Sequence, residues 1–429
     1  MWKFEKSLSS INTVVIILIA LSQGLLCISD LALSYMYKDD FKLSPGQVAL
    51  FNSVMTLPWI IKPVWGFISD CYPILGKRRS PYLLIFGSIG ATCWILLGTS
   101  SPSLVSTFLI LACIQTCVCF CNVIGEALVV EESKKTNEIN QNTENASSFV
   151  TLFFGARAMG TVLTAYCGGL LLELVNKQFV FVLTAACPLL LITSSLLLNE
   201  EKVTTDIKVT HQAEMIFKFI TRNDVFLPIL FILCFTSVPS CTDAMFFFYT
   251  NKLGFSPQFM GKMKLAYGIG TIIGMVVYSS WLKDISFKKI LVCNACLCIT
   301  VSLSQIVLVT RANTAIGVPD EIFAVFCTFI VQLTTELSMI PLLVLCCKIC
   351  PNNIEGSLYA LLMSTMNFGS MISSQSGGLL MIFLGISQTH FSNLWALILI
   401  TSTSMLLPLP LLYFVEDIKP SHKSDYELV

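Results

Sequence analysis

Twelve stretches of mostly apolar residues follow one another along the chain, separated by short polar breaks. Each is long enough to cross a bilayer as an α-helix, which takes about 20 residues. The composition agrees, because 55% of the residues are hydrophobic and 12% are charged, against about 25% charged in a soluble domain. We therefore predict an all-α integral membrane protein with twelve transmembrane helices, at 11–35, 46–68, 81–100, 103–131, 147–172, 178–198, 224–250, 256–281, 288–309, 321–348, 355–385 and 390–415.

Lysine and arginine are distributed unevenly among the segments that join these helices. If both termini lie inside the cell, the inner segments hold most of them, including the cluster at 77–79. Positive residues accumulate on the cytoplasmic side of membrane proteins, so we expect both termini in the cytoplasm. The net charge is zero, which gives the chain no general attraction to nucleic acid.

The two halves of the chain resemble each other. Five landmarks of the first half recur in the second, in the same order and at a nearly constant offset. They are Asp30 and Asp243, Ser44-Pro45 and Ser256-Pro257, Asp70 and Asp284, Glu126 and Glu336, and Gly168-Gly169 and Gly377-Gly378.

This repeat divides the chain into two six-helix halves, residues 1–199 and 224–429, joined by a cytoplasmic linker at 200–223. The second half ends in a short cytoplasmic tail. A tandem six-helix repeat is the architecture of major facilitator transporters, in which the substrate lies near the midplane between the halves. The halves then rock to expose the substrate to either side. The repeat therefore favours transport over a receptor or an ion channel.

A short polar motif lies between the second and third expected helices. It runs from Gly66 to Asp70 and continues to the basic cluster Lys77, Arg78 and Arg79. This pattern resembles the cytoplasmic loop motif of the major facilitator superfamily, where an aspartate and basic residues hold helices together at the inner face. We expect such a latch here. A degenerate counterpart contains Asp284, and Glu355 begins the eleventh helix near the same face.

Six ionisable side chains fall deep inside the expected helices. They are Asp30, Lys62, Glu126, Arg157, Asp243 and Glu336. Such groups cost several kcal/mol unless they are paired or hydrated, so each is a candidate for function.

Two interpretations of these charges stay open at the level of sequence. In one, they form pairs that hold helices together, for instance Glu126 with Arg157. In the other, Lys62 and Arg157 attract an anionic substrate, since an arginine can bind a carboxylate with two parallel hydrogen bonds. A buried carboxylate can also carry a coupling proton, and Asp30 and Asp243 occupy equivalent places for that role.

Four blocks of sequence resemble the folate–biopterin transporter family, and they are spread along nearly the whole chain. They are Ser29-Asp30 to Tyr35 with Leu57-Pro-Trp-Ile-Ile-Lys-Pro63, Gly155-Ala-Arg-Ala-Met-Gly160, Pro239-Ser-Cys-Thr-Asp-Ala-Met245, and Glu355-Gly-Ser-Leu-Tyr-Ala360. One stretch departs from the family. Asn122-Val-Ile-Gly-Glu126 stands where many members have an Asp-containing stretch, which leaves the exact substrate open.

The resemblance implies uptake of folates, pterins or p-aminobenzoate across the plasma membrane, coupled to protons. By matching position, the residues that carry the family motifs are Asp30, Lys62, Pro63, Asp70, Arg157, Asp243, Glu355 and Gly356. Lys62 and Arg157 would suit the glutamate end of folate. One of the buried acids, Asp30, Asp243, Glu126 or Glu336, would suit the pterin ring.

Other functions compete with this one. Relatives of the same class carry other flat or amphoteric solutes such as S-adenosylmethionine, and a non-transporting sensor can use the same fold. An enzyme is not expected, because no nucleophile and base occur together and no phosphate-binding glycine loop is present. The 18 cysteines lie mostly in apolar runs, where cysteine acts as a small hydrophobic residue. We expect no metal or cofactor, and the partners predicted are the solute, a proton and the lipid bilayer.

Overall fold

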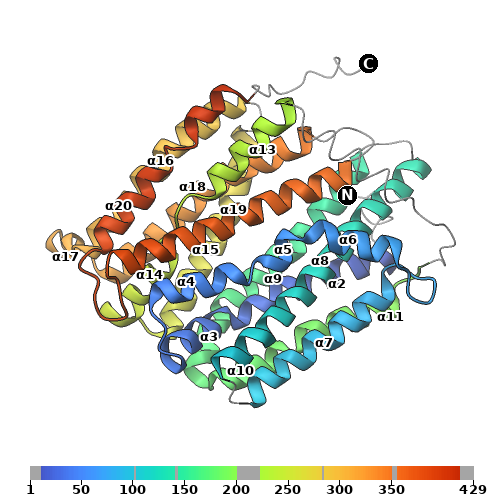
Figure 1. Ribbon diagram of the computed structural model, residues 1–429, viewed down its shortest axis with the longest axis horizontal. Helices are drawn as coiled ribbons and strands as arrows, with labels where there is room; N and C mark the ends of the chain where they lie inside the picture. Colours follow the sequence, from blue (N-terminus) through green and yellow to red (C-terminus); the bar gives the residue numbers. More distant parts are fainter. Residues whose placement is uncertain are drawn as a thin grey trace. The chain divides into compact units, whose positions relative to one another are not determined.

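The computed structural model describes residues 11–100, 103–140, 144–200, 223–282, 285–349 and 355–415. Throughout these residues the secondary structure is helical, with turns between helices and a single isolated β-bridge. The chain divides into two compact units, which can be followed by the sequence colours in Figure 1. Unit 1 comprises Met1–Lys42, Met55–Val209 and Ser256–Lys262, and unit 2 comprises Leu43–Val54, Thr210–Phe255 and Met263–Val429.

The units follow the two sequence halves apart from two short exchanged segments. Unit 1 holds α2 (Ile11–Leu25), α3 (Asp30–Tyr35), α5 (Leu57–Ile60), α6 (Lys62–Cys71), α7 (Ser80–Thr99), α8 (Leu104–Asn140), α9 (Glu144–Leu174), α10 (Lys177–Thr184) and α11 (Ala186–Leu197). Unit 2 holds α4 (Pro45–Val54), α13 (Asn223–Thr236), α14 (Thr242–Phe247), most of α15 (Pro257–Val277), α16 (Phe287–Val309), α17 (Ala312–Ala315), α18 (Asp320–Ile349), α19 (Glu355–Phe383) and α20 (Leu394–Ser404).

Nine helical segments of the described residues are long and apolar enough to cross a membrane, and each coincides with an expected span. They are Ile11–Asp40, Pro45–Cys71, Ser80–Thr99, Leu104–Glu132, Lys177–Leu197, Pro257–Leu282, Phe287–Val309, Asp320–Leu343 and Leu394–Tyr413. The prediction of an all-helical membrane protein is therefore confirmed.

The other three expected spans are also helical. The fifth and eleventh are α9, of 31 residues, and α19, of 29 residues. Both are rich in Gly, Ser and Thr, which lowers their hydropathy but lets helix backbones approach closely. The seventh is broken after Thr236 and resumes as α14 at Thr242.

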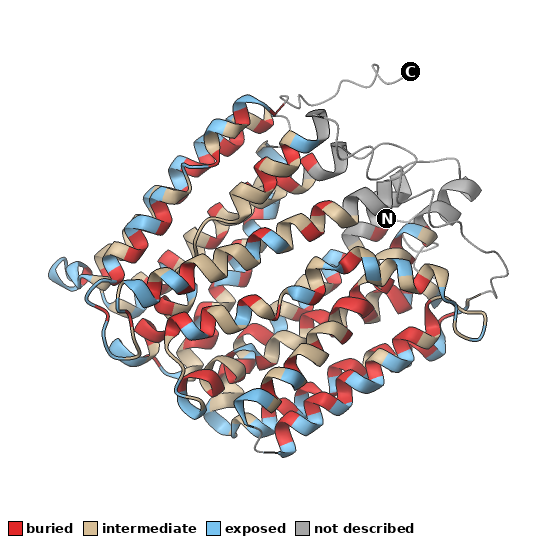
Figure 2. Ribbon diagram, in the orientation of Figure 1, coloured by how far each residue is buried: buried red, intermediate tan, exposed pale blue. Residues whose placement is uncertain are grey.

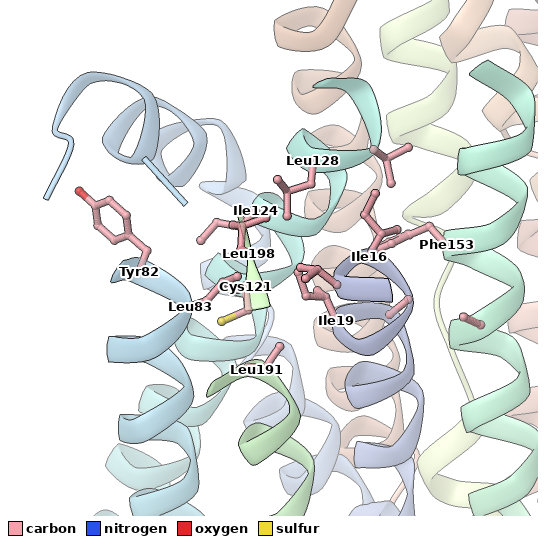
Figure 3. Close-up of a cluster of buried hydrophobic side chains, with 14 of the residues drawn as sticks. Ile16, Ile19, Tyr82, Leu83, Cys121, Ile124, Leu128, Phe153, Leu191 and Leu198 are labelled. Atoms are coloured by element: carbon pink, nitrogen blue, oxygen red, sulfur yellow. The ribbon is translucent and has the colours of Figure 1, made fainter. Parts of the chain in front are cut away.

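The helices of unit 1 pack around an apolar core contributed by α2, α7, α8, α9 and α11. At its centre Phe120 of α8 is 1% exposed, and the rings of Tyr82 and Phe86 stack on it with centroids 5.1 and 4.2 Å away. Figure 3 shows Ile16 and Ile19 of α2 beside α8 in this cluster. Because lipid tails are as apolar as leucine, close packing of this kind stabilises the helices against one another.

Unit 2 has a separate core of its own. Phe231 of α13, Leu291 of α16, Leu342 of α18 and Leu362 of α19 are fully buried together in it. The outer faces of helices in both units are apolar as well. On α7, for example, Leu83 is buried and Leu84 is exposed, and Figure 2 shows buried and exposed residues alternating along this helix. A helix that is apolar all round is typical of a membrane span.

The internal repeat is visible in the backbone. Each of the helices that contain Asp30 and Asp243 ends in a π-helical turn, at Met36–Asp40 and Phe248–Lys252, which occupy equivalent places in the two halves. Lys42 and Gly254, which are also equivalent, both have a positive φ, of 52° and 71°. Pro45 and Pro257 then begin α4 and α15. The two segments therefore share their local conformation as well as their sequence.

Close glycine contacts repeat in the same way. In unit 1, a Cβ on Gly168 of α9 would lie 2.7 Å from the carbonyl oxygen of Ile28. In unit 2, a Cβ on Gly377 of α19 would meet the carbonyl oxygen of Ser240. Gly168 corresponds to Gly377 in the repeat, and Ile28 corresponds to Ser240 to within a few positions. Equivalent segments thus approach each other closely within each unit, as the sequence repeat requires.

Candidate functional site

A latch of polar side chains closes one end of unit 1. Arg79, just before α7, is 6% exposed, and its guanidinium contacts Asp70 of α6 and Glu131 of α8 at 2.7 Å each. It also donates to the hydroxyl of Ser69. Burial lowers the pKa of Arg79, but the neighbouring Glu131 and Asp70 outweigh this effect and raise it above its ordinary value. The guanidinium therefore stays protonated and joins the end of α6 to α8.

A second acid, which the sequence did not single out, fixes the start of α7. The carboxylate of Glu200 accepts hydrogen bonds from the backbone N–H groups of Arg78, Arg79 and Ser80, at 2.6, 2.9 and 2.9 Å. Backbone N–H groups at a helix start have no partners inside the helix, and an anion at a helix N-terminus is stabilising. Lys77 pairs through its backbone with Ile74 in the adjoining turn.

The structure thus brings Asp70 and Arg79 of the expected latch together, and Glu131 and Glu200 join them. That this latch lies at the cytoplasmic face stays a prediction. Asp284, the expected counterpart in the second half, lies outside the described residues. Glu355 begins α19, but its side chain also lies outside the described part of the structure.

A buried ion pair lies farther along the same helices. Pro58 and Pro63 interrupt the second span, so that α5 ends at Ile60 and Lys62 begins α6. The Lys62 side chain is 5% exposed, and its Nζ lies 2.7 Å from Oε1 of Glu126 on α8. The Trp59 ring lies 5.8 Å from the same nitrogen. The interpretation that Glu126 pairs with Arg157 is wrong, because Glu126 pairs with Lys62 and the described residues contain no ion pair between Glu126 and Arg157.

Two side-chain amides extend this polar stripe along α8. Gln115 accepts a hydrogen bond from the indole of Trp59 at 3.2 Å. Asn122, one helical turn before Glu126, donates to Oε1 of Gln23 on α2 at 2.9 Å. Neither Gln23 nor Asn122 was expected to be part of a site. Their signal in the sequence was polarity within an apolar span, with Asn122 placed on the same helix face as Glu126.

Arg157 lies on α9, in the same unit, and is partly buried. Among the described residues no carboxylate lies within ion-pair distance of it. Its backbone carbonyl packs against Gly24 of α2, where any Cβ would collide with it. Arg157 therefore lies on α9 close to α2, and its guanidinium forms no ion pair with any described residue.

Unit 2 carries a carboxylate where unit 1 has an ion pair. Glu336 of α18 accepts a hydrogen bond from Nε2 of Gln332 at 2.8 Å, and that nitrogen also donates to the hydroxyl of Thr271 at 3.0 Å. Gly274 corresponds to Lys62 in the repeat, just as Pro257 corresponds to Pro45. A Cβ on Gly274 would lie 2.8 Å from the Cβ of Glu336. The repeat thus keeps the acid and replaces its cation by glycine.

The two symmetric aspartates differ in their surroundings. Asp30 begins α3 and is exposed, whereas Asp243 in α14 is partly buried. No hydrogen bond or ion pair of the Asp243 carboxylate occurs among the described residues.

Of the six charges expected inside the helices, the structure brings Lys62 together with Glu126. In the described ranges, Arg157, Asp243 and Glu336 have no ionic partner. Within the same ranges, no group of three potential metal ligands converges.

Comparison with known proteins agrees with this architecture. The chain is 35% identical over 393 residues to the folate-biopterin transporter of Synechocystis sp., covering 91% of this chain and 78% of that protein. It is 34% identical over 398 residues to folate transporter 2 of Plasmodium falciparum, covering 93% and 86%.

Solved structures of transporters share the fold. The nucleoside transporter NupG superposes with a TM-score of 0.71 at 13% identity, over 94% of this chain and 98% of that one. The D-xylose–proton symporter superposes with a TM-score of 0.67 at 16% identity, over 94% and 97%. The major facilitator fold expected from the repeat is therefore confirmed. The model of the BT1 family matches residues 23–427, and the chain belongs to this family of membrane transporters.

Proposed function

We propose that this protein is a secondary active transporter of folates and related pteridines, or of p-aminobenzoate, and that protons drive it. The observation that carries the proposal is the likeness to two proteins named as folate transporters, at 34–35% identity over more than nine-tenths of the chain. The arrangement of charges in each unit supports it independently.

Unit 1 supplies groups for an anionic solute. Folate ends in a glutamate with two carboxylates. Arg157 has no ionic partner in the described residues, so its guanidinium can bind a carboxylate through two parallel hydrogen bonds. The Lys62–Glu126 pair adds a buried cation that can exchange partners when an anion enters. An aromatic ring beside it, Trp59, offers a face for a flat solute.

Unit 2 supplies groups for a proton. A carboxylate inside a span must be paired, hydrated or protonated, and Asp243 has no side-chain partner in the described residues. We assign the coupling proton to Asp243 rather than to the exposed Asp30. In this scheme the halves 1–199 and 224–429 rock about the solute, with both termini in the cytoplasm and the protein in the plasma membrane.

Uptake of labelled folic acid by cells that express the protein tests the substrate class. Unlabelled pterin, p-aminobenzoate and S-adenosylmethionine serve as competitors, and the Arg157→Ala variant at equal surface abundance serves as the matched control. Saturable uptake that folates block is the expected result. If the protein reaches the surface and takes up no folate, or if S-adenosylmethionine alone competes, the proposed substrate is wrong.

The same cells test proton coupling. Uptake should rise as external pH falls, because the inward proton gradient grows, and a protonophore should depress it. Asp243→Asn should make uptake insensitive to pH, whereas Asp30→Asn should keep the pH dependence. A flat profile in the unmodified protein, unaffected by the protonophore, would remove the coupling, and retained pH dependence in Asp243→Asn would remove that assignment.

A further inference from the structure

Two buried amides in unit 1 leave hydrogen-bonding groups unused. Gln23 of α2 is 7% exposed and Asn122 of α8 is 0% exposed. Asn122 donates to Gln23 at 2.9 Å, and this bond uses one donor and one acceptor. Nε2 of Gln23 and Oδ1 of Asn122 are both buried and have no partner among the described residues. The nitrogen and oxygen of a side-chain amide can be interchanged by rotating the group by 180°. If both amides are rotated, Nδ2 of Asn122 and Oε1 of Gln23 become the unused atoms. In either assignment the pair keeps one unused nitrogen and one unused oxygen.

Such unused groups are costly inside a protein. Each buried polar atom without a partner costs about 1–3 kcal/mol, and most buried polar groups in proteins are satisfied. Apolar residues of similar size at both positions would avoid the cost in an otherwise apolar pair of spans. Several single polar atoms in the described residues are buried without a partner, but Gln23 and Asn122 leave a donor and an acceptor on one hydrogen-bonded pair. A group that offers the complementary acceptor and donor would satisfy both atoms at once.

The position of the amide pair links it to the charged groups already described. Asn122 is one helical turn from Glu126, and residues four apart lie on the same face of a helix. Glu126 in turn contacts Lys62. On the other side, Gln23 precedes Gly24, which packs against the backbone of Arg157. The amide pair is thus next to the Lys62–Glu126 ion pair on one side and next to α9, which carries Arg157, on the other.

The unused groups specify a ligand chemistry. One N–H donor beside one carbonyl acceptor complements a cyclic amide, in which a ring N–H lies next to a C=O. The pterin ring has this edge at N3 and O4, whereas p-aminobenzoate has none. We propose that Gln23 and Asn122 bind the N3–O4 edge of a pterin ring and so determine specificity for pteridines over simple aromatic acids. This assignment rests on the proposed function, which supplies the substrate class.

Binding to the purified full-length protein tests the assignment without relying on uptake. Equilibrium dialysis measures the affinity of pterin and of 3-methylpterin, in which a methyl group replaces the N3 hydrogen. The unmodified protein should prefer pterin by about tenfold or more, because a site built to hydrogen-bond a group rejects the analogue that lacks it. Gln23→Met and Asn122→Leu should each lose that preference, by weakening pterin about tenfold and 3-methylpterin less than about threefold.

Asn294 of α16 provides a matched control. It is 6% exposed, and its Nδ2 donates to the carbonyl of Thr334 and to the hydroxyl of Ser338 within unit 2. Its Oδ1, like that of Asn122, is buried and has no partner among the described residues, but no unused donor lies on a bonded partner amide beside it. Asn294→Leu should lower the melting temperature and leave the preference for pterin unchanged. If Asn122→Leu does not fold, Asn122→Ser, which keeps a hydroxyl for Gln23, carries the same test.

Each outcome has a distinct meaning. Folded Gln23 and Asn122 variants that keep the preference for pterin overturn the amide assignment and leave the proposed function standing, as would be the case if the pair held only a structural water. An unmodified protein that binds no pteridine overturns the proposed substrate class, and the assignment falls with it.

Discussion

Replacing Lys62 by methionine keeps an apolar stem of similar length and removes the ammonium group that Glu126 contacts at 2.7 Å. Removing one member of a buried ion pair costs about 3–5 kcal/mol, because the other charge stays in place without a partner. The Lys62 side chain is 5% exposed, but that of Glu126 is 31% exposed. Since partial hydration of Glu126 reduces the cost, we expect the free energy of unfolding to fall by about 2–3 kcal/mol.

A double-mutant cycle isolates the contribution of the pair. Glu126→Gln removes the other charge, and the variant with both changes has neither member of the pair. The double variant should therefore lose less stability than the sum of the two single variants, with a coupling energy of about 1.5–3 kcal/mol. Unfolding of the purified protein by SDS in detergent micelles, followed by tryptophan fluorescence, measures all four free energies.

The ion pair between Lys177 and Asp40 is the matched control. Its side-chain exposures are 21% and 44%, so both charges are in contact with solvent. Exposed pairs contribute about 0–1 kcal/mol, so Lys177→Met should change the free energy of unfolding by less than about 1 kcal/mol. If the Lys62 and Glu126 losses add to within about 0.5 kcal/mol, the contact does not stabilise the protein and the reasoning from burial is refuted.

Three further changes test other contacts. Arg157→Ala should abolish uptake at normal surface abundance, and Arg157→Lys should keep only part of it. The reason is that lysine lacks the planar guanidinium that binds a carboxylate through two hydrogen bonds. Uptake assays combined with surface labelling measure both effects. Glu200→Ala should cost about 1–2 kcal/mol by uncapping α7, as SDS unfolding would show, whereas Glu173→Ala at an exposed site should cost little. Gly169→Ala should lower the melting temperature, since its Cβ would lie 2.7 Å from the Cα of Gly261, whereas Gly155→Ala on the same helix meets no atom within 4 Å and should not.

The fold could be predicted from the sequence because the bilayer leaves few alternatives. Segments of about 20 apolar residues must become helices, since no water is present to satisfy the backbone. Hydropathy alone is weaker evidence for a membrane span at α9 and α19, because their small and polar residues lower it while allowing close packing. Their Gly-Gly pairs identified them as equivalent helices, and the contacts of Gly168 and Gly377 agree with that equivalence.

The site was less predictable, because pairing depends on how each helix is rotated and placed. Charge and depth singled out Lys62, Glu126 and Arg157, but no pattern in the sequence shows which of them meet. The role of Glu200 at the start of α7 could not be predicted for a related reason. It is far along the chain from Ser80, whose N–H group donates to it, and only the folded loops bring them together.

The repeat also explains why the two units can differ in chemistry while sharing a scaffold. Close helix contacts recur at equivalent positions, so the backbone of each unit presents the same places to side chains. The charges at those places do not recur, since Glu126 faces Lys62 whereas Glu336 faces Gly274. A cation in unit 1 suits an anionic solute. In unit 2, Asp243 and Glu336, which have no ionic partner among the described residues, suit a proton. If unit 1 binds the solute and unit 2 the proton, neutralising Lys62 should change the apparent affinity for the solute, and neutralising Asp243 should change the pH dependence of uptake. Variants of the two units that altered both properties together would show that solute and proton share one site.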